Sequence, residues 1–364
     1  MKSIMEKLTQ YGASKQQWDE QALYPALTLA RVVSQARDCC RIVAESGEYL
    51  ADVSGKFRHT ATQPSDYPAV GDFVLVDPLT MASGSAVIQR VLTRKSVFMR
   101  TAVGNVHQSQ VVAANIDIVF VCMALNSDYN LSRLERYLSV AWDSGAVPIV
   151  VLTKADLCED LPRRVCEAEA VAPGTEVLVT SGLQQNSCRI LSDRLKPGVT
   201  ASLIGSSGVG KSTLINCLLG ADSQATSTVR QDGKGRHTTT RRDLLLLPQG
   251  GIVIDTPGMR ELGAERVDLS RSFSDIDALA GQCRFRDCTH TTEPGCAVVQ
   301  ALQNGTLEQR RLDSYQKLKR EARYDGLGFK ALEAEKLNTM FEQIGGMKKA
   351  RKYIRQTNKR TGEF

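Results

Sequence analysis

Gly205-Ser206-Ser207-Gly208-Val209-Gly210-Lys211-Ser212 is the stretch of sequence that decides the fold. It has the form G-x-x-x-x-G-K-[ST] and lies between the apolar run 201–204 and a helix-like run, 213–219. Glycines in such a loop let backbone N–H groups surround a phosphate, the lysine reaches the β- and γ-phosphates, and the last serine ligates Mg²⁺. The stretch therefore predicts a phosphate loop between a strand and a helix. We predict nucleotide contacts from Gly205, Ser206, Ser207, Gly208, Val209, Gly210, Lys211, Ser212 and Thr213.

A second segment, Asp255-Thr256-Pro257-Gly258, follows the apolar run 252–254. An isolated sequence of this kind is commonly only a β-turn. Downstream of a phosphate loop, it has the position of the second magnesium-associated segment of a nucleotide-binding fold. We therefore expect Asp255 to hold Mg²⁺, directly or through water, and the N–H of Gly258 to contact the γ-phosphate.

Base selection is predicted at Thr153-Lys154-Ala155-Asp156, which is similar to the guanine-recognition pattern N-K-x-D. The Asp156 carboxylate accepts hydrogen bonds only, so it suits guanine N1 and the exocyclic amine, which adenine cannot both supply. Lys154 would lie along the base, and Ser181 would add a contact to it. Thr153 replaces the usual asparagine, which leaves one base-orienting contact open. Asp156 favours GTP over ATP, since a phosphate loop does not itself select the base.

The order of these segments is reversed relative to an ordinary GTPase, because the base-recognition segment comes first. Apolar runs at 116–123, 148–152, 177–179, 201–204 and 252–254 are typical of buried strands, and four of them lead directly into a predicted binding segment. Functional segments at the carboxyl ends of successive strands indicate a doubly wound α/β fold. If the segments form one domain, its chain must be circularly permuted.

The residue that orients the attacking water is less evident. In Ras-like proteins a glutamine follows the D-x-x-G segment, but this chain has Met259 there. The candidate replacement is His237 in the glycine-rich stretch 233–240, because a neutral imidazole can accept a hydrogen bond from water. An exposed or RNA-contacting histidine is the alternative. Either Thr238 or Thr239 would meet Mg²⁺, and we favour Thr239.

Four potential metal ligands lie close together as C-x₄-C-x-H-x₅-C. They are Cys283, Cys288, His290 and Cys296. Three thiols and one imidazole complete a tetrahedral zinc site without an open position, which predicts a structural zinc ion. A small segment with little core of its own needs such support.

The segment from Arg31 to about Arg100 has short apolar and alternating runs separated by turn pairs such as Ser46-Gly47 and Ser54-Gly55. Closely spaced strands of this kind predict a small all-β barrel or sandwich, and a five-stranded oligonucleotide-binding barrel has the right size. After about Leu269 the strands stop, and helical spacing of Leu312, Tyr315 and Leu318 predicts a helix.

The 364 residues allow two or three domains and contain no apolar run near the ~20 residues that a membrane helix needs. The N-terminus also lacks the apolar segment of a signal peptide, so we expect a cytoplasmic protein. The net charge is +6, and seven basic residues without an acidic one lie between Met347 and Arg360. Such a tail suits a polyanion or is simply a solvated, disordered terminus.

These motifs together resemble the RsgA (YjeQ) family of bacterial ribosome-biogenesis GTPases. The likeness rests on the permuted order, the Gly-Arg-His-Thr-Thr segment 235–239, Leu134-Glu135-Arg136-Tyr137-Leu138, and Cys-Arg-Phe-Arg-Asp-Cys-Thr-His at 283–290. It extends into the expected barrel at Val53–Phe57 and Val70–Asp72. The resemblance implies late maturation of the small ribosomal subunit, GTP hydrolysis stimulated by that subunit, and water positioning by His237.

We therefore predict a multidomain chain. The expected parts are an N-terminal extension (1–30), an all-β OB-fold-like RNA-binding barrel (31–110), a circularly permuted α/β P-loop GTPase domain (111–270), and a small helical zinc-binding domain with a basic tail (271–364). Expected ligands are GTP or GDP with Mg²⁺, one structural Zn²⁺, and the rRNA of the small (30S) subunit, bound by a monomer away from membranes. The alternative is a nucleotide-regulated RNA-binding assembly factor in which hydrolysis is incidental.

Overall fold

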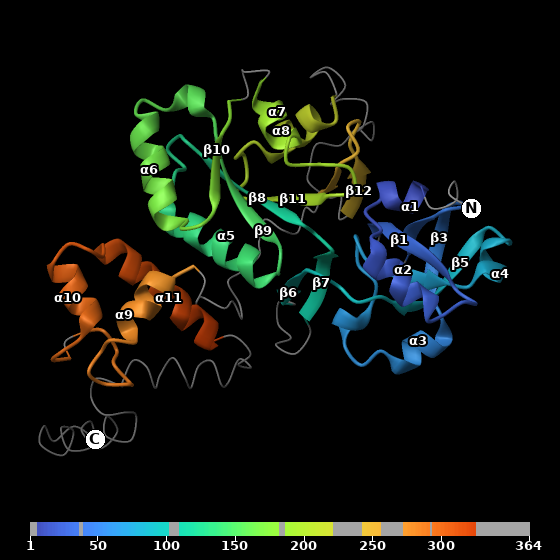
Figure 1. Ribbon diagram of the computed structural model, residues 1–364, viewed down its shortest axis with the longest axis horizontal. Coiled ribbons are helices and arrows are strands. Elements are labelled where there is room, and N and C mark those ends of the chain that lie inside the picture. The colour runs from blue at the N-terminus through green and yellow to red at the C-terminus, as the bar shows by residue number, and fades with distance from the viewer. Residues whose placement is uncertain are drawn as a thin grey trace, which may run out of the picture.

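A computed structural model describes residues 6–35, 39–101, 109–181, 186–220, 242–255, 272–291 and 293–324. The predicted His237, Thr238, Thr239, Gly258 and Met259, and the basic tail 347–360, lie outside the described residues. The described parts are arranged in a row, with a β barrel at one end, an α/β sheet in the middle and a helical part at the other end (Figure 1). No helix among the described residues is long and apolar enough to cross a membrane.

The barrel is closed by five strands. They are β1 (Thr28–Gln35), β2 (Cys40–Ala44), β3 (Gly47–Val53), β4 (Phe73–Val76) and β5 (Ser85–Val91). Pairing runs β1-β2-β3-β5-β4 and returns from β4 to β1, so the barrel strands leave no free edge among themselves. Alternate residues such as Val32, Ile42 and Val74 fill its interior. The predicted small all-β barrel is confirmed, although its first strand begins three residues before the expected boundary.

Short elements surround the barrel. Helices α1 (Glu6–Gln10) and α2 (Lys15–Ala22) precede it, and α3 (Gly55–Thr60), the 3₁₀ turn η1 (Pro64–Asp66) and α4 (Pro78–Met81) connect its strands. The hairpin of β6 (Val97–Thr101) and β7 (Ser109–Ala114) then leads into the central sheet.

The central sheet has the order β10-β9-β8-β11-β13-β12. Its strands are β8 (Ile118–Ala124), β9 (Val147–Thr153), β10 (Glu176–Val179), β11 (Thr200–Ile204), β12 (Arg242–Leu246) and β13 (Ile252–Asp255). All pairs are parallel except β12 with β13. The helices between them are α5 (Leu131–Asp143), η2 (Ala155–Leu157), α6 (Leu161–Val171), α7 (Asn186–Ser192) and α8 (Lys211–Leu218).

Strand β8 shows why this sheet is buried on both faces. Val119, Val121 and Met123 lie in the same apolar cluster as Leu134 and Leu138 of α5. Phe120, Cys122 and Ala124, which point the opposite way, lie in the cluster that contains Leu214 and Leu218 of α8. The continuous apolar run at 116–123 predicted a strand that is buried on both faces of the sheet, and the structure confirms this prediction.

The strand order places a topological switch point between β8 and β11. From β8 the chain proceeds outward through β9 to β10, and it then returns to add β11 on the other side of β8. Loops that leave the carboxyl ends of two such strands diverge, and the crevice between them is where doubly wound folds bind ligands.

The barrel and the central sheet form one continuous eleven-stranded sheet. Strand β12 pairs antiparallel with β1, with Ser34 opposite Asp243 and Gln35 opposite Arg242. The sequence pattern does not predict this pairing, because it joins residues about 200 positions apart.

The helical part consists of α9 (Ser274–Ala280), α10 (Ala297–Gln303) and α11 (Gln309–Tyr324). Leu312, Tyr315 and Leu318 are buried on one face of α11, as their spacing predicted. This part packs beside α5, on the opposite side of the central sheet from the barrel (Figure 1).

Candidate functional site: the phosphate loop and the zinc cluster

The loop 205–210 leaves β11 at the switch point and ends where α8 begins at Lys211. Gly208 and Gly210 have φ angles of +74° and +110°, which L side chains rarely adopt. At Gly205 a Cβ atom would lie 2.5 Å from the carbonyl oxygen of Cys122 on β8. The glycines therefore provide both the turn and the close approach of the loop to the neighbouring strand.

Lys211 folds back over this loop. Its Nζ donates hydrogen bonds of 2.6 Å to the carbonyl oxygens of Gly205 and Ser206. These contacts keep the ammonium group next to the backbone N–H groups of the loop, where an anion would be attracted by both.

Thr153 connects the base-recognition segment to the phosphate loop. Its buried Oγ1 donates a 2.6 Å hydrogen bond to the carbonyl oxygen of Val209. The Val209 carbonyl needs a hydrogen-bond donor, and the Thr153 hydroxyl supplies it. The sequence left the role of Thr153 open, and the structure assigns it a scaffolding contact.

Asp156 and Ser181 come from the ends of adjacent strands and meet. The Ser181 hydroxyl donates a 2.6 Å hydrogen bond to Asp156 Oδ1. Lys154 has the left-handed φ of +58°, which turns the chain sharply at the end of β9. The N–H of Ala155 also bonds to the carbonyl oxygen of Thr180. The two segments predicted to contact a base are therefore held together.

Asp128 is a residue of this site that the sequence reasoning missed. It lies in the loop after β8, and its Oδ2 accepts a 2.6 Å hydrogen bond from the Ser206 hydroxyl. Arg133 forms a 2.7 Å ion pair with the same carboxylate. The hydrogen bond from Ser206 and the charge of Arg133 lower the pKa of Asp128. Its position after a buried strand, at the edge that carries the phosphate loop, was the signal that could have identified it.

Two predicted magnesium ligands share this edge of the sheet. Ser212 lies in the first turn of α8, and Asp255 is the last residue of β13, which pairs with β11. Both are exposed, and a hydroxyl with a carboxylate provides the oxygen ligands that Mg²⁺ prefers. The third predicted ligand, Thr239, lies outside the described residues, so the set stays a prediction.

The four predicted metal ligands converge in the helical part. The ligand atoms of Cys283, Cys288, His290 and Cys296 all lie within 4.8 Å of one another. The Sγ atoms of Cys283 and Cys296 are 3.8 Å apart, and His290 Nδ1 is 3.7 Å from the first and 3.5 Å from the second. Zn–S bonds of about 2.3 Å and Zn–N bonds of about 2.0 Å give tetrahedral edges of about 3.5–3.8 Å. The cluster therefore fits zinc.

Local structure favours the ligand state of Cys283 and His290, whereas burial raises the pKa of the Cys288 thiol to about 11. Burial raises the pKa of the Cys283 thiol, but hydrogen bonds from the backbone N–H groups of Ala297 and Val298 outweigh it and lower the pKa. Burial lowers the pKa of His290, which favours the neutral imidazole that binds metals. His290 has a left-handed φ of +60°, and its Nδ1 lies next to the thiols of Cys283 and Cys296.

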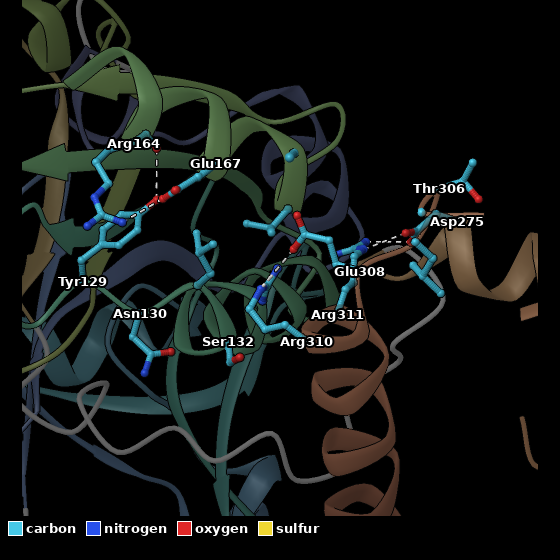
Figure 2. A pocket seen from close by; sticks show the side chains of 15 residues that line it. Tyr129, Asn130, Ser132, Arg164, Glu167, Asp275, Thr306, Glu308, Arg310 and Arg311 are labelled. Carbon is cyan, nitrogen blue, oxygen red and sulfur yellow. Dashed lines mark hydrogen bonds and ion pairs between the residues drawn. The ribbon is translucent and has the colours of Figure 1, made fainter. Parts of the chain in front are cut away.

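A pocket of about 720 Å³ is lined by the start of α5 and by α6, and by α9, residues 305–308 and α11 of the helical part. Figure 2 shows its lining, with Asn130 and Ser132 at the start of α5, and with Arg310 and Arg311 of α11, the second of which is directed toward Asp275. An ion pair between Arg164 and Glu167 of α6 lines its other side.

Comparison with known proteins places the chain among permuted GTPases. The model of the RsgA GTPase family matches residues 91–265. A protein of Lactiplantibacillus plantarum named small ribosomal subunit biogenesis GTPase RsgA 2 is 48% identical over 329 residues, which cover 90% of this chain and 92% of that protein. A small ribosomal subunit biogenesis GTPase RsgA of Methanosarcina acetivorans is 40% identical over 92% of each chain.

Two solved structures share the fold. YjeQ from Thermotoga maritima is 29% identical, with a TM-score of 0.61 over 81% of this chain and 98% of that one. YloQ, described as a circularly permuted GTPase, is 23% identical, with a TM-score of 0.59 over 82% and 95% of the two chains. The predicted permuted fold, with its barrel and its Cys/His cluster, is therefore confirmed.

Proposed function

The chain belongs to the RsgA GTPase family, and we propose that it hydrolyses GTP to GDP and phosphate as a late maturation factor of the small (30S) ribosomal subunit. The observation that supports this best is the junction of three strand ends. Thr153 bonds to Val209, and Ser181 bonds to Asp156, so the segments for phosphate and base form one connected surface. Relatives named for this role, 40–48% identical over most of the chain, support the biological assignment.

The phosphate loop binds the β- and γ-phosphates in this proposal. Its backbone N–H groups and the Lys211 ammonium neutralise negative charge as it develops on the transferred phosphoryl group. The proposed GTP contacts are Thr153, Lys154, Asp156, Ser181, Gly205, Ser206, Ser207, Gly208, Val209, Gly210, Lys211, Ser212, Thr213 and Gly258.

Asp156 selects guanine, oriented by the hydroxyl of Ser181. Competition of bound GTP by ATP tests this role, and equal affinities for the two nucleotides would remove the guanine assignment. Thr153→Val keeps the side-chain volume but leaves the Val209 carbonyl without its donor. We expect about a tenfold loss of GTP affinity from an unpaired buried carbonyl, while Thr153→Ser, the matched control, should bind normally.

The hydrolytic step is assigned to His237, whose imidazole accepts a hydrogen bond from the attacking water. Ser212, Thr239 and Asp255 hold the Mg²⁺ that accompanies GTP and shields its phosphate charge. Cys283, Cys288, His290 and Cys296 hold one structural Zn²⁺, whose contribution is to fix the fold of the helical part.

The proposed partner is the rRNA of the small subunit, bound by a monomer in the cytoplasm. The barrel (31–110) and the zinc-binding part with its basic tail (271–364) would contact the RNA on either side of the GTPase domain (111–270). Phosphate contacts from a basic tail supply affinity that weakens as salt rises.

Turnover of GTP with and without purified small subunits tests the proposal, for the wild type and for His237→Ala. We expect stimulation by subunits for the wild type and its loss in the variant. Equal rates in all four conditions would overturn the stimulated GTPase and favour an RNA-binding factor with incidental hydrolysis.

A further inference from the structure

Asp128, in the loop before α5, bonds both to Ser206 of the phosphate loop and to Arg133 in the first turn of α5. The side of α5 contacts the zinc-binding part through α11. The geometry points to α5 as a link through which docking of the zinc-binding part sets the position of the phosphate loop, with Asp128 as a positioning residue. This inference rests on the proposed function, and it concerns how that site is regulated.

At the phosphate end of the link, Asp128 joins two groups. Its carboxylate accepts the Ser206 hydroxyl at 2.6 Å and pairs with Arg133 of α5 at 2.7 Å. Arg133 also donates to the backbone carbonyl of Asp128. Because Ser206 is the second residue of the phosphate loop, a shift of α5 is passed to that loop through two charge-assisted contacts.

At the other end, Glu135 of α5 is fully buried and receives two arginines of α11. Arg311 Nη1 is 2.9 Å from its Oε1, and Arg310 Nη1 is 3.1 Å from its Oε2. Arg311 also forms a bidentate pair with Asp275 of α9, with both contacts at 2.7 Å. The Glu135 carboxylate is therefore paired with cations of the zinc-binding part, and its burial depends on their presence.

The segment between these contacts is a capped helix. Asn130 caps the helix by accepting a hydrogen bond from the N–H of Arg133, and Ser139 bonds to the carbonyl oxygen of Glu135. Arg133 and Glu135 are two positions apart, so their side chains leave different faces of the same turn. One face pairs with Asp128, which in turn bonds to the phosphate loop, and the other pairs with α11.

The pocket beside α5 leaves this face partly unpacked. Residues 305–308 and the first turn of α5 both line a 720 Å³ space, and Arg310 and Arg311, which pair with Glu135, line it as well (Figure 2). A partner that shifts the zinc-binding part would change the pairing of Glu135 and, through Arg133 and Asp128, the placement of Ser206. By linkage, nucleotide binding would favour the docked position equally.

Titration of fluorescent GTP into the zinc-loaded full chain tests the link. Glu135→Gln keeps the volume of the side chain but removes its charge. Neither Glu135 nor Arg310 belongs to the proposed nucleotide site. We expect Glu135→Gln and Arg310→Gln to weaken GTP binding between about twofold and thirtyfold. Asp128→Ala should weaken it as well, and adding Glu135→Gln to Asp128→Ala should cause little further loss, because both act along one path.

Arg163→Gln is the matched control, since it removes an exposed ion pair with Glu167 on α6. We expect it to bind GTP as the wild type does. If Glu135→Gln melts earlier but binds GTP normally, or if the losses multiply in the double variant, the link is overturned. Arg310 is half-exposed, so Arg310→Gln decides the matter if Glu135→Gln does not fold. A wild type that binds no GTP contradicts the proposed function itself, which is a separate result.

Discussion

The barrel and the helical part (α9 to α11) are attached to the central sheet in opposite ways. The barrel is attached through its backbone, since β1 pairs with β12 and continues the sheet. The helical part is attached through side chains, with Glu135 between Arg310 and Arg311. Paired strands move together, whereas a cluster of ion pairs can separate and form again. The comparison therefore suggests one fixed junction and one adjustable junction.

Besides this backbone pairing, the fixed junction contains the fully buried side chain of Arg31 on β1. Its guanidinium donates to the carbonyl oxygens of Tyr11, Gly71 and Asn115 and to the Thr200 hydroxyl. Burial lowers the pKa of Arg31 to about 10. Gly71 is required here, because a Cβ atom would lie 2.1 Å from the carbonyl oxygen of Ala114. These contacts join the N-terminal helices, the barrel and β11.

Removal of zinc should produce the largest effect, and only on the adjustable side. Structural zinc contributes about 10 kcal/mol in small domains, and α9 and α10 are only seven residues each. We expect a chelator to abolish amide protection in both helices while the barrel and central sheet stay protected, as followed by hydrogen exchange. Cys166→Ser, away from the cluster, should change nothing. Persistent protection of α10 without metal would contradict the zinc assignment.

Arg31→Met should destabilise the fixed junction by about 3–5 kcal/mol, because three carbonyls and a hydroxyl lose their donor in a buried site. Urea unfolding should show the barrel and the central sheet losing stability together. Arg41→Met on the neighbouring strand β2 breaks only a half-exposed pair with Glu48 and serves as the control. Separate loss of the barrel alone would show that the junction is not shared.

Arg311→Met should lower the free energy of unfolding by about 2–3 kcal/mol, less than Arg31→Met does. The reason is that Arg310 still pairs with Glu135 and that Asp275 is partly exposed. The loss should be confined to the helical part, with unchanged unfolding of the barrel. Hydrogen exchange of α11 against that of β1 measures the difference. An equal loss in both would mean that the two junctions are mechanically alike.

Gln35→Ala should have the smallest effect, about 1 kcal/mol or less. Gln35 is at the β1–β12 seam, where its Oε1 is 3.4 Å from Arg242 and its Nε2 is 3.2 Å from the Pro68 carbonyl. If backbone pairing holds the seam, the side chain adds little. A loss of unfolding free energy above about 3 kcal/mol, measured by urea unfolding, would instead show that side chains hold the β1–β12 seam together.

The sequence predicted most of the individual elements. Continuous apolar runs identified the buried strands, since a parallel strand covered on both faces has no polar side. Short alternating runs identified the barrel. The motif spacings named the phosphate loop and the four metal ligands, because their chemistry depends on residue types at fixed distances along the chain.

Asp128 shows where such reasoning stops. A single aspartate before a helix is ordinary in sequence, and only the adjacency of β8 and β11 brings it to Ser206. Thr153 is a similar case, because its hydroxyl bonds to the carbonyl oxygen of Val209, which lies 56 positions away in the sequence.

The sequence alone therefore determined the family, the order of segments and the residues with local chemical signatures. Tertiary structure decided how the parts are joined: β1 to β12 through the backbone, and Glu135 to Arg311 through buried charge. Motifs are local because a loop or a metal site uses neighbouring residues. Junctions are not, because strand pairing and buried ion pairs depend on which distant surfaces come into contact after folding.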